Sequence, residues 1–549
     1  MKDLALPAQL PLRPPAEVMR LKRLGAFFPT RLSFLRVLTR RLSEEGARLS
    51  RPVWAIDGDG YGQAVLSLPL GGRTYSLVCV TQPLADDQRS DRVIATAWDA
   101  AFVLYDGVPD GAEIDRIAAA APLQEAGRFT ERDLVLSRAN RSVRLWGHVI
   151  DRLRAGGQPD AAFVNAIGYL MRTTAVYGNG KFGIADRDQF STRPGLGLSF
   201  MAEMLTVWMI RQFTVDLAEY VGGASLDRRL ARHLGVGNAT GLGMAPFLVS
   251  HPVLLNNWMM VRETALARAR ALPLLSDAQA ARVLHLAQRA ERHLGQWQVP
   301  EAAHQARIDA LRADWALFLR NLPSALDRDH PFDTLMRATG TQSLDLQELL
   351  VSLAIEACPE LVDGLAECLT DPFGAPPPDF TDTDALGAVA RAQFGWVQDH
   401  DFARTEQTAQ FWYVSEEKLE PRLGRRHEEP GADRESPLFV ARAVQAMLAD
   451  LPDRPEPVVE FLTRHPDHLW AVERVAVAQA CPYSEIRDNL LAEDCLPIDM
   501  LRAKLSLFGA SKFDPKSDLW TRVTMAQGAP LAEDLGTARA DDWWMPVLT

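Results

Sequence analysis

The chain has 549 residues, 47% of them hydrophobic and 24% charged, and its formal net charge is −12. This composition excludes wholesale disorder, and the length predicts two to four domains or one large core. No dense Lys/Arg stripe with interleaved aromatic residues is present. Because an acidic surface also repels phosphate backbones, we expect no nucleic-acid partner.

The cysteine pattern and the N-terminus predict a soluble cytoplasmic protein. The five cysteines include no CxxC pair, which is typical of a reducing compartment rather than of a disulfide scaffold. The first 25 residues lack the continuous apolar stretch of a secretory signal.

Residues 1–49 are expected to form a helical arm. Residues 29–46, "PTRLSFLRVLTRRLSEEG", have the pattern of an amphipathic helix with four arginines on its polar side: Arg31, Arg36, Arg40 and Arg41. Two interpretations stay open. The helix packs on the next domain and its arginines are solvated, or it associates with a membrane surface.

Residues 50–110 predict a small antiparallel sheet, because β-branched and aromatic residues alternate with polar ones. Gly71 and Gly72 lie where a tight hairpin would turn. The glycines of "DGDGYG" (57–62) do not form a dinucleotide fingerprint, since a second strand rather than a helix is expected after them.

Residues 111–369 are expected to form the main helical domain, because apolar residues recur there at spacings of three and four. The run from 199 to 215 contains Glu203, Arg211 and Gln212. Charged groups are costly in a bilayer, so we predict a buried helix and no transmembrane segment. The individual helices are predicted at 137–156, 160–178, 199–223, 277–297 and 301–323.

The proline-rich stretch 370–384 is predicted to be a linker, and residues 385–549 a C-terminal helical domain. The charged stretch 420–437 interrupts that domain and is expected to be a mobile loop, either a solvated excursion or a lid. The fold class expected is α+β and predominantly α-helical. A small antiparallel sheet near the N-terminus would precede a large multi-helix region.

Two glycine-asparagine segments, "YGNGKFGIADR" (177–187) and "GVGNATGLGMAPF" (235–247), each follow an apolar run that is interpreted as a helix. Glycine and asparagine tolerate left-handed backbone, so several N–H groups could point at one anion, and Lys181 would add a positive charge. A carboxylate, phosphate or sulfonate would suit such a pocket. Its expected binding residues, the first three on one helix face, are Asn165, Tyr169, Arg172, Asn179, Arg187, Asn238 and Thr240.

The candidate catalytic residues are Lys181, Tyr177, His251 and Cys481. Because Pro482 favours a helix start, Cys481 is expected near a helix N-terminus, where the helix dipole lowers a thiol pKa. No metal site is assigned. His465 and His468 lie three residues apart, but Pro466 makes the first of them a helix-start residue.

The function expected is an enzyme that acts on a small anionic metabolite by acid–base chemistry of the lyase, isomerase or hydrolase type. Hydride transfer fits less well because no dinucleotide motif is present. The alternative is a helical scaffold or interaction protein whose glycine-asparagine segments are architectural. The sequence assigns no cofactor and leaves homo-oligomer formation open.

Overall fold

The structure is a computed structural model, and it describes residues 11–28, 30–88, 98–121, 129–173, 192–238, 251–370, 378–402, 411–413, 422–424, 437–487, 496–517 and 520–548. Residues 371–377 of the predicted linker and most of the predicted loop at 420–437 lie outside these residues. The same holds for five predicted site residues, Tyr177, Asn179, Lys181, Arg187 and Thr240.

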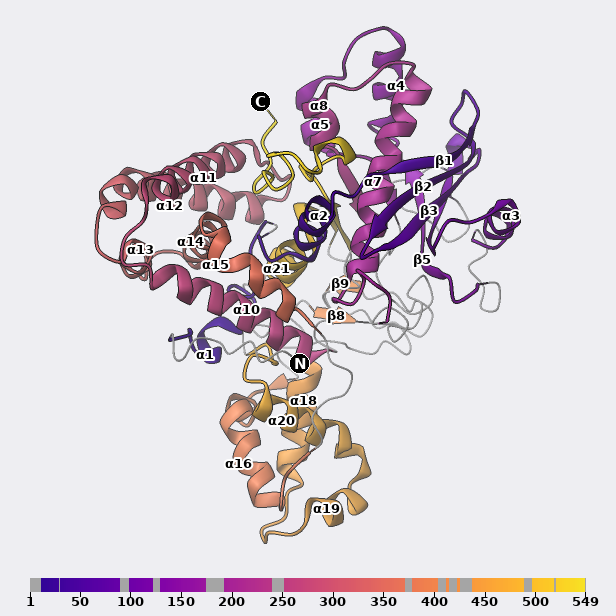
Figure 1. The fold of residues 1–549 in the computed structure, drawn as a ribbon. Helices are drawn as coiled ribbons and strands as arrows, with labels where there is room; N and C mark the ends of the chain where they lie inside the picture. Colours follow the sequence, from indigo (N-terminus) through magenta and orange to yellow (C-terminus); the bar gives the residue numbers. More distant parts are fainter. Residues whose placement is uncertain are drawn as a thin grey trace.

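A mixed β-sheet forms the centre of the main body (Figure 1). Within the described residues it has nine strands in the order β1-β2-β3-β4-β5-β6-β7-β11-β10. Neighbouring strands are antiparallel except β6 and β7, which are parallel. The strands are β1 Ser50–Ile56, β2 Gly62–Leu70, β3 Arg73–Thr81, β4 Ala100–Asp106, β5 Asp133–Arg141, β6 Tyr169–Thr173, β7 Gly235–Asn238, β10 Ala510–Ser517 and β11 Trp520–Met525.

The two faces of this sheet have different covers. The long helix α7 (Met201–Gly222) packs against β3 to β7 on one face (Figure 1). On the opposite face, α3 (Gly111–Ala120) places Ile114 and Ile117 against a cluster that includes Val78 and Val103. Burial of these apolar side chains is the main favourable term that holds the layers together.

The predicted hairpin is confirmed. β2 and β3 pair from Gly62 opposite Thr81 to Leu70 opposite Arg73. Between them, Gly71 and Gly72 have φ values of 62° and 77°. Positive φ at both central residues of a two-residue turn favours glycine, because a Cβ atom is strained there.

The prediction of a small, N-terminal sheet is wrong, because the sheet continues through residues interpreted as helical. β5 takes the start of the predicted helix at 137–156, where only α4 (Trp146–Arg154) is helical. The predicted helix at 160–178 ends early: α5 (Ala161–Ile167) stops at Gly168, which has φ of 83°. The chain then enters β6, whose hydrogen bonds to β5 and β7 come from remote residues that helical periodicity does not reveal.

The predicted helix at 199–223 is confirmed as α7, and so is the expectation that it is buried. Glu203, Arg211 and Gln212 are at most 3% exposed. Among the described helices, none is long and apolar enough to cross a membrane.

Beside the sheet lies a group of packed helices (Figure 1). The predictions at 277–297 and 301–323 are confirmed by α11 (Asp277–Gln296) and α12 (Ala302–Leu326). The other helices of the main body are α1 Pro15–Val18, α2 Phe34–Glu44, α8 Arg228–His233, α10 Pro252–Arg270, α13 Pro331–Ala338, α14 Leu344–Ala357, α15 Pro359–Val362 and α21 Pro497–Phe508.

A second, separate hydrophobic core contains residues between 386 and 478, including Leu386, Val444 and Phe461. Its helices form the lower lobe of Figure 1, and they are α16 Thr383–Phe394, α18 Pro437–Ala449, α19 Val458–Arg464 and α20 Leu469–Ala480. The chain then returns to the first core through α21, β10, β11 and a C-terminal segment with buried Trp543 and Trp544. The stretch 385–549 is therefore divided between two cores. A short pair, β8 (Phe411–Tyr413) and β9 (Arg422–Gly424), also lies within it.

The arginines of the N-terminal helix were expected to be solvated, but Arg31 and Arg36 are buried. Arg36 on α2 is 0% exposed, and its two Nη atoms lie 2.6 Å from the two carboxylate oxygens of Glu356. Arg31 lies 2.6 Å from Asp541, which also accepts from Arg36 at 2.9 Å. The polar side of α2 thus faces carboxylates of the main body, and this removes the basis for membrane association.

Candidate anion-binding site

The second glycine-asparagine segment begins on strand β7, not at a helix end as predicted, whereas the first segment (177–187) lies outside the described residues, beyond the end of β6 at Thr173. In the parallel pair β6–β7, Arg172 lies opposite Gly237 and Thr173 lies opposite Asn238. The last described residues of the two strands, Thr173 and Asn238, therefore lie at the same edge of the sheet. The segments lie outside the described residues beyond Thr173 and Asn238, and a shared pocket stays a prediction.

The sheet face at this edge is polar and buried. Arg172 is 2% exposed, and its partner on β5, Asn140, is 1% exposed. Arg138 lies two residues before Asn140 on the same strand, and burial lowers the pKa of its guanidinium. Asn238, at the end of β7, is also 0% exposed, but it lies opposite Thr173 and so belongs to the other face of the sheet from Arg172.

The predicted face shared by Asn165, Tyr169 and Arg172 does not exist, because the helix ends before the last two. Asn165 is on α5, whereas Tyr169 is on β6 and its hydroxyl accepts from Arg144 Nη2 at 3.2 Å. The structure therefore separates Asn165 from Arg172 and places it against His233 of α8.

Two predicted catalytic residues, Cys481 and His251, are described, and only Cys481 was expected at a helix N-terminus. Cys481 is the C-terminal cap of α20, so the prediction of a helix N-terminus is wrong. Burial raises the pKa of its thiol, which opposes thiolate formation. His251 is half-buried and precedes Pro252 at the first turn of α10.

A cavity of about 260 Å³ lies where α8, α11 and the C-terminal segment meet. Its wall carries five arginines and two aspartates, and because Glu533 and Asp227 pair with two of these arginines, the local excess is one positive charge in a chain of net charge −12. The charged lining residues are Arg228, Arg229, Arg232, Arg289, Arg539, Asp534 and Asp542. We call this space the arginine cavity.

The arginines of this cavity have different partners. Arg228 lies 2.6 Å from Glu533, and Arg229 lies 3.3 Å from Asp227, so these two are neutralised locally. Arg289 pairs with Asp542. Within the part of the chain that the structure describes, the exposed Arg539 side chain has no carboxylate at ion-pair distance.

Arg232 is held rigidly at the centre of the wall. Its Nε donates to Gly528 O at 3.1 Å, and its Nη2 donates to Arg539 O at 2.6 Å and to Asp542 O at 2.9 Å. Burial lowers the pKa of Arg232, and repulsion from Arg289 and Arg539 adds to that effect, while Asp534 opposes it. A lowered arginine pKa means that the site disfavours its own positive charge, and an anion would relieve that cost.

A further buried cation lies behind the wall. Arg211 of α7 is 1% exposed and donates to four backbone carbonyls, Leu234 O at 2.6 Å, Arg232 O at 2.8 Å, Pro530 O at 3.1 Å and Ala231 O at 3.5 Å. Burial, with a smaller contribution from Arg232, lowers its pKa to about 9. The side chain is still mostly protonated at neutral pH, and it joins α7 to the two segments that form the cavity.

A second, smaller cavity of about 20 Å³ adjoins the first, because His233 and Pro546 line both. Its walls are polar: Asn165 Oδ1 lies 2.9 Å and Gln527 Nε2 lies 3.0 Å from His233 Nε2. The space holds about one water-sized group. The asparagine oxygen favours a protonated Nε2, and the glutamine amide favours an unprotonated one. Nε2 of the imidazole thus has a hydrogen-bond partner whether or not it carries a proton.

A partial signal for this site is present in the sequence. Four basic residues fall within α8, at 228, 229, 232 and 233, in an otherwise acidic chain. Arg289 and Arg539 are 250 residues apart, and nothing in either local sequence indicates that they line one cavity. Asn165 was predicted as a binding residue, but beside Arg172 rather than beside His233.

No known protein family, curated protein or solved structure matches the chain. Its function therefore has to be argued from the residues of the site and their chemistry.

Proposed function

We propose that the protein binds a small anionic metabolite in the arginine cavity. The observation that carries this proposal is the excess of guanidinium groups over carboxylates on one wall of an acidic protein. A volume of about 260 Å³ is below the range of drug-sized ligand sites, roughly 300–1,000 Å³. A carboxylate or phosphate compound of a few carbon atoms fits it. Arginine suits these groups because its planar fork can donate two parallel hydrogen bonds.

Acid–base chemistry on that anion is the enzymatic part of the proposal. Arg539 and Arg289 would hold the charged group at the mouth. His233 borders the adjoining cavity, and a substrate group that displaces Asn165 Oδ1 or Gln527 Nε2 from its Nε2 would exchange a proton there. Asn165 and Gln527 would position its ring. This arrangement supports lyase, isomerase or hydrolase chemistry, in which a proton moves and no hydride donor is required.

The test is a thermal-shift panel on the full chain with carboxylates, phosphates and sulfonates. Binding to the folded state stabilises it by mass action, by about 2.7 kcal/mol at a hundredfold excess over Kd. Arg539→Ala is expected to remove most of this gain without unfolding the protein, because the side chain is exposed. Arg337→Ala is the matched control, since that arginine is 79% exposed on α13.

Lys181→Ala distinguishes the two anion sites that the chain offers. If it removes the shift while Arg539→Ala leaves it intact, the anion binds at the glycine-asparagine segments instead. If no anion raises the melting temperature, or if Arg539→Ala and Arg337→Ala behave alike, the arginine cavity is not a binding site.

An interaction protein is the second candidate, and one observation favours it. The second core exposes large apolar side chains on neighbouring helices: Phe439 is 46% exposed, Val459 is 75% exposed and Leu469 is 49% exposed. Contiguous exposed apolar side chains mark interaction surfaces more often than isolated ones do. Val459→Glu would weaken self-association or partner binding in sedimentation experiments if this surface is used.

A further inference from the structure

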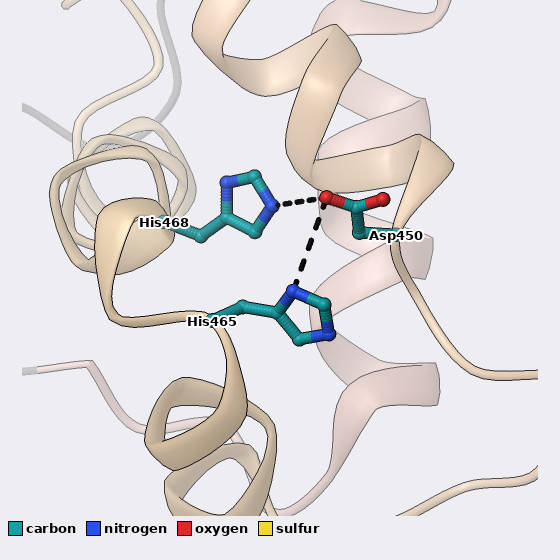
Figure 2. A group of neighbouring side chains, drawn as sticks. All are labelled: Asp450, His465 and His468. Carbon is teal, nitrogen blue, oxygen red and sulfur yellow. Dashed lines mark hydrogen bonds and ion pairs between the residues drawn. The ribbon is translucent and has the colours of Figure 1, made fainter.

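Three potential metal ligands converge in the second core, far in sequence from the arginine cavity. Donor atoms of Asp450, His465 and His468 all lie within 4.8 Å of one another. His468 Nε2 lies 2.8 Å and His465 Nδ1 lies 4.0 Å from the same oxygen, Asp450 Oδ2. Figure 2 shows both imidazole rings turned toward this oxygen.

Helix ends fix each of the three positions. Asp450 directly follows α18, and its N–H bonds to Ala446 O at 3.2 Å. His465 caps the C-terminus of α19, with its N–H 2.9 Å from Phe461 O. Pro466 then begins a short 3₁₀ turn (Pro466–His468) that leads into α20. Pro466, from which a helix start was predicted at His465, thus lies between α19 and α20. His465 and His468 both belong to this junction.

The rings have little freedom because they stack on an aromatic neighbour. The His468 ring is 5.8 Å from that of Phe461 with an angle of 10°, and the His465 ring is 5.0 Å from it with an angle of 31°. The two imidazoles are themselves stacked at 5.7 Å. Phe461 is fully buried in the second core, so it is a firm support. Ligands held in this way need little reorganisation when an ion binds.

The local field also favours a cation. α18 and α19 both direct their C-termini, the negative ends of their helix dipoles, toward the cluster, whereas α20, which begins beside it, contributes one positive end. Asp450 adds a full negative charge where its own helix dipole is already unfavourable for a carboxylate. A cation at this point offsets the negative ends of α18 and α19 and the charge of the Asp450 carboxylate.

The distances suit tetrahedral coordination. Two ligand atoms about 2.1 Å from a tetrahedral zinc ion are roughly 3.4 Å from each other. The distances from Asp450 Oδ2, 2.8 and 4.0 Å, lie on either side of that value, so small side-chain rotations bring both to it. Side-chain exposures of 50% for Asp450, 36% for His465 and 13% for His468 leave a path for the ion.

We propose that Asp450, His465 and His468 form a Zn²⁺ site with one position open to water. Two imidazoles and a carboxylate are the ligand types that zinc takes, whereas Mg²⁺ and Ca²⁺ prefer oxygen ligands alone. Zinc replaces the proton that His468 Nε2 donates to Asp450. The ion joins the ends of α18 and α19 to the start of α20, and it stabilises the second core.

The test uses the full, untagged chain after treatment with a chelator and dialysis. Titration calorimetry with ZnCl₂ is expected to show one equivalent bound, and Co²⁺ is expected to give the visible absorption of a tetrahedral site. His468→Ala and His465→Ala are each expected to weaken zinc binding by about 100-fold or more, the upper end of the effect seen for residues that only orient a ligand. Asp450→Asn keeps the shape of the side chain, and it is expected to weaken binding as well.

His285→Ala is the matched control, because His285 is exposed on α11 in the main body. This variant is expected to bind zinc like the parent chain. The proposal is overturned if the parent chain takes up no stoichiometric zinc, or if Asp450→Asn and His465→Ala bind it as tightly as His285→Ala. In either case the three side chains form only a hydrogen-bonded helix junction.

Discussion

Two regions of the molecule are rich in arginine, and they use it in opposite ways. In the first region, Arg13, just before α1, and Arg262 of α10 share the buried carboxylates Glu263 and Glu348. In the arginine cavity, Arg232, Arg289 and Arg539 face solvent-accessible space with fewer carboxylates than cations. Residue type alone does not separate these roles.

The two regions differ in how completely carboxylates neutralise each guanidinium. Arg13 donates to both Glu263 oxygens at 2.7 and 2.8 Å and to Glu348 at 3.0 Å. The attraction to Glu348 and Glu263 outweighs burial and raises the pKa of Arg13. At Arg232 burial prevails and the pKa is lowered. Arginines that are fully paired with buried carboxylates hold the fold together. A cavity wall with more arginines than carboxylates can still pair with an anionic ligand.

The largest effect is expected from Glu348→Ala. Glu348 is 0% exposed and faces Arg13 at 3.0 Å and Arg23 at 3.2 Å. Its removal leaves buried cations uncompensated, and the free energy of unfolding is expected to fall by about 3–5 kcal/mol. Urea unfolding followed by tryptophan fluorescence measures this. Glu367→Ala is the control: it breaks a pair of similar length with Arg41, but at 60% exposure, and is expected to cost about 0–1 kcal/mol. Equal losses in both variants would contradict the comparison.

Acid is expected to weaken the same network. Burial alone would raise the pKa of Glu348, but Arg13 and Arg262 outweigh it and lower the pKa from 4.5 to about 2. A lowered carboxyl pKa gives stability that is present above pH 5 and is lost as the pH falls toward 2. Between pH 6 and pH 3 this loss is about 2 kcal/mol. Asp345 and Asp541 also have lowered pKa values, so Glu348→Gln still loses stability in acid, and unfolding curves at the two pH values should show this additional loss only in the parent chain. A similar pH slope in both proteins would show that Glu348 is not the titrating group.

The smallest effect on stability is expected from Arg539→Ala. In the arginine cavity this change removes a cation that repels Arg232. The free energy of unfolding without ligand should therefore stay within about 0.5 kcal/mol of the parent value. The same urea experiment measures it. A loss of several kcal/mol would mean that Arg539 belongs to a matched structural network, like Arg13.

Local patterns in the sequence determined part of the fold. Gly71 and Gly72 predicted the hairpin because the turn conformation depends on those two residues alone. The helices α7, α11 and α12 were predicted because helical hydrogen bonds join residues four apart, so the signal lies within one segment. The polar residues inside α7 also predicted correctly that it is buried in the protein.

Only the tertiary structure decided the rest. β6 and β7 look like parts of helices or loops until each is paired with the other and with β5 and β11, because strand pairing depends on residues far away in sequence. The arginine cavity combines α8, α11 and the C-terminal segment for the same reason. His465 and His468 were visible as a pair, but Asp450 joins them only because α18 ends beside the junction of α19 and α20. The sequence determined which groups the chain carries, and long-range packing decided which of them meet.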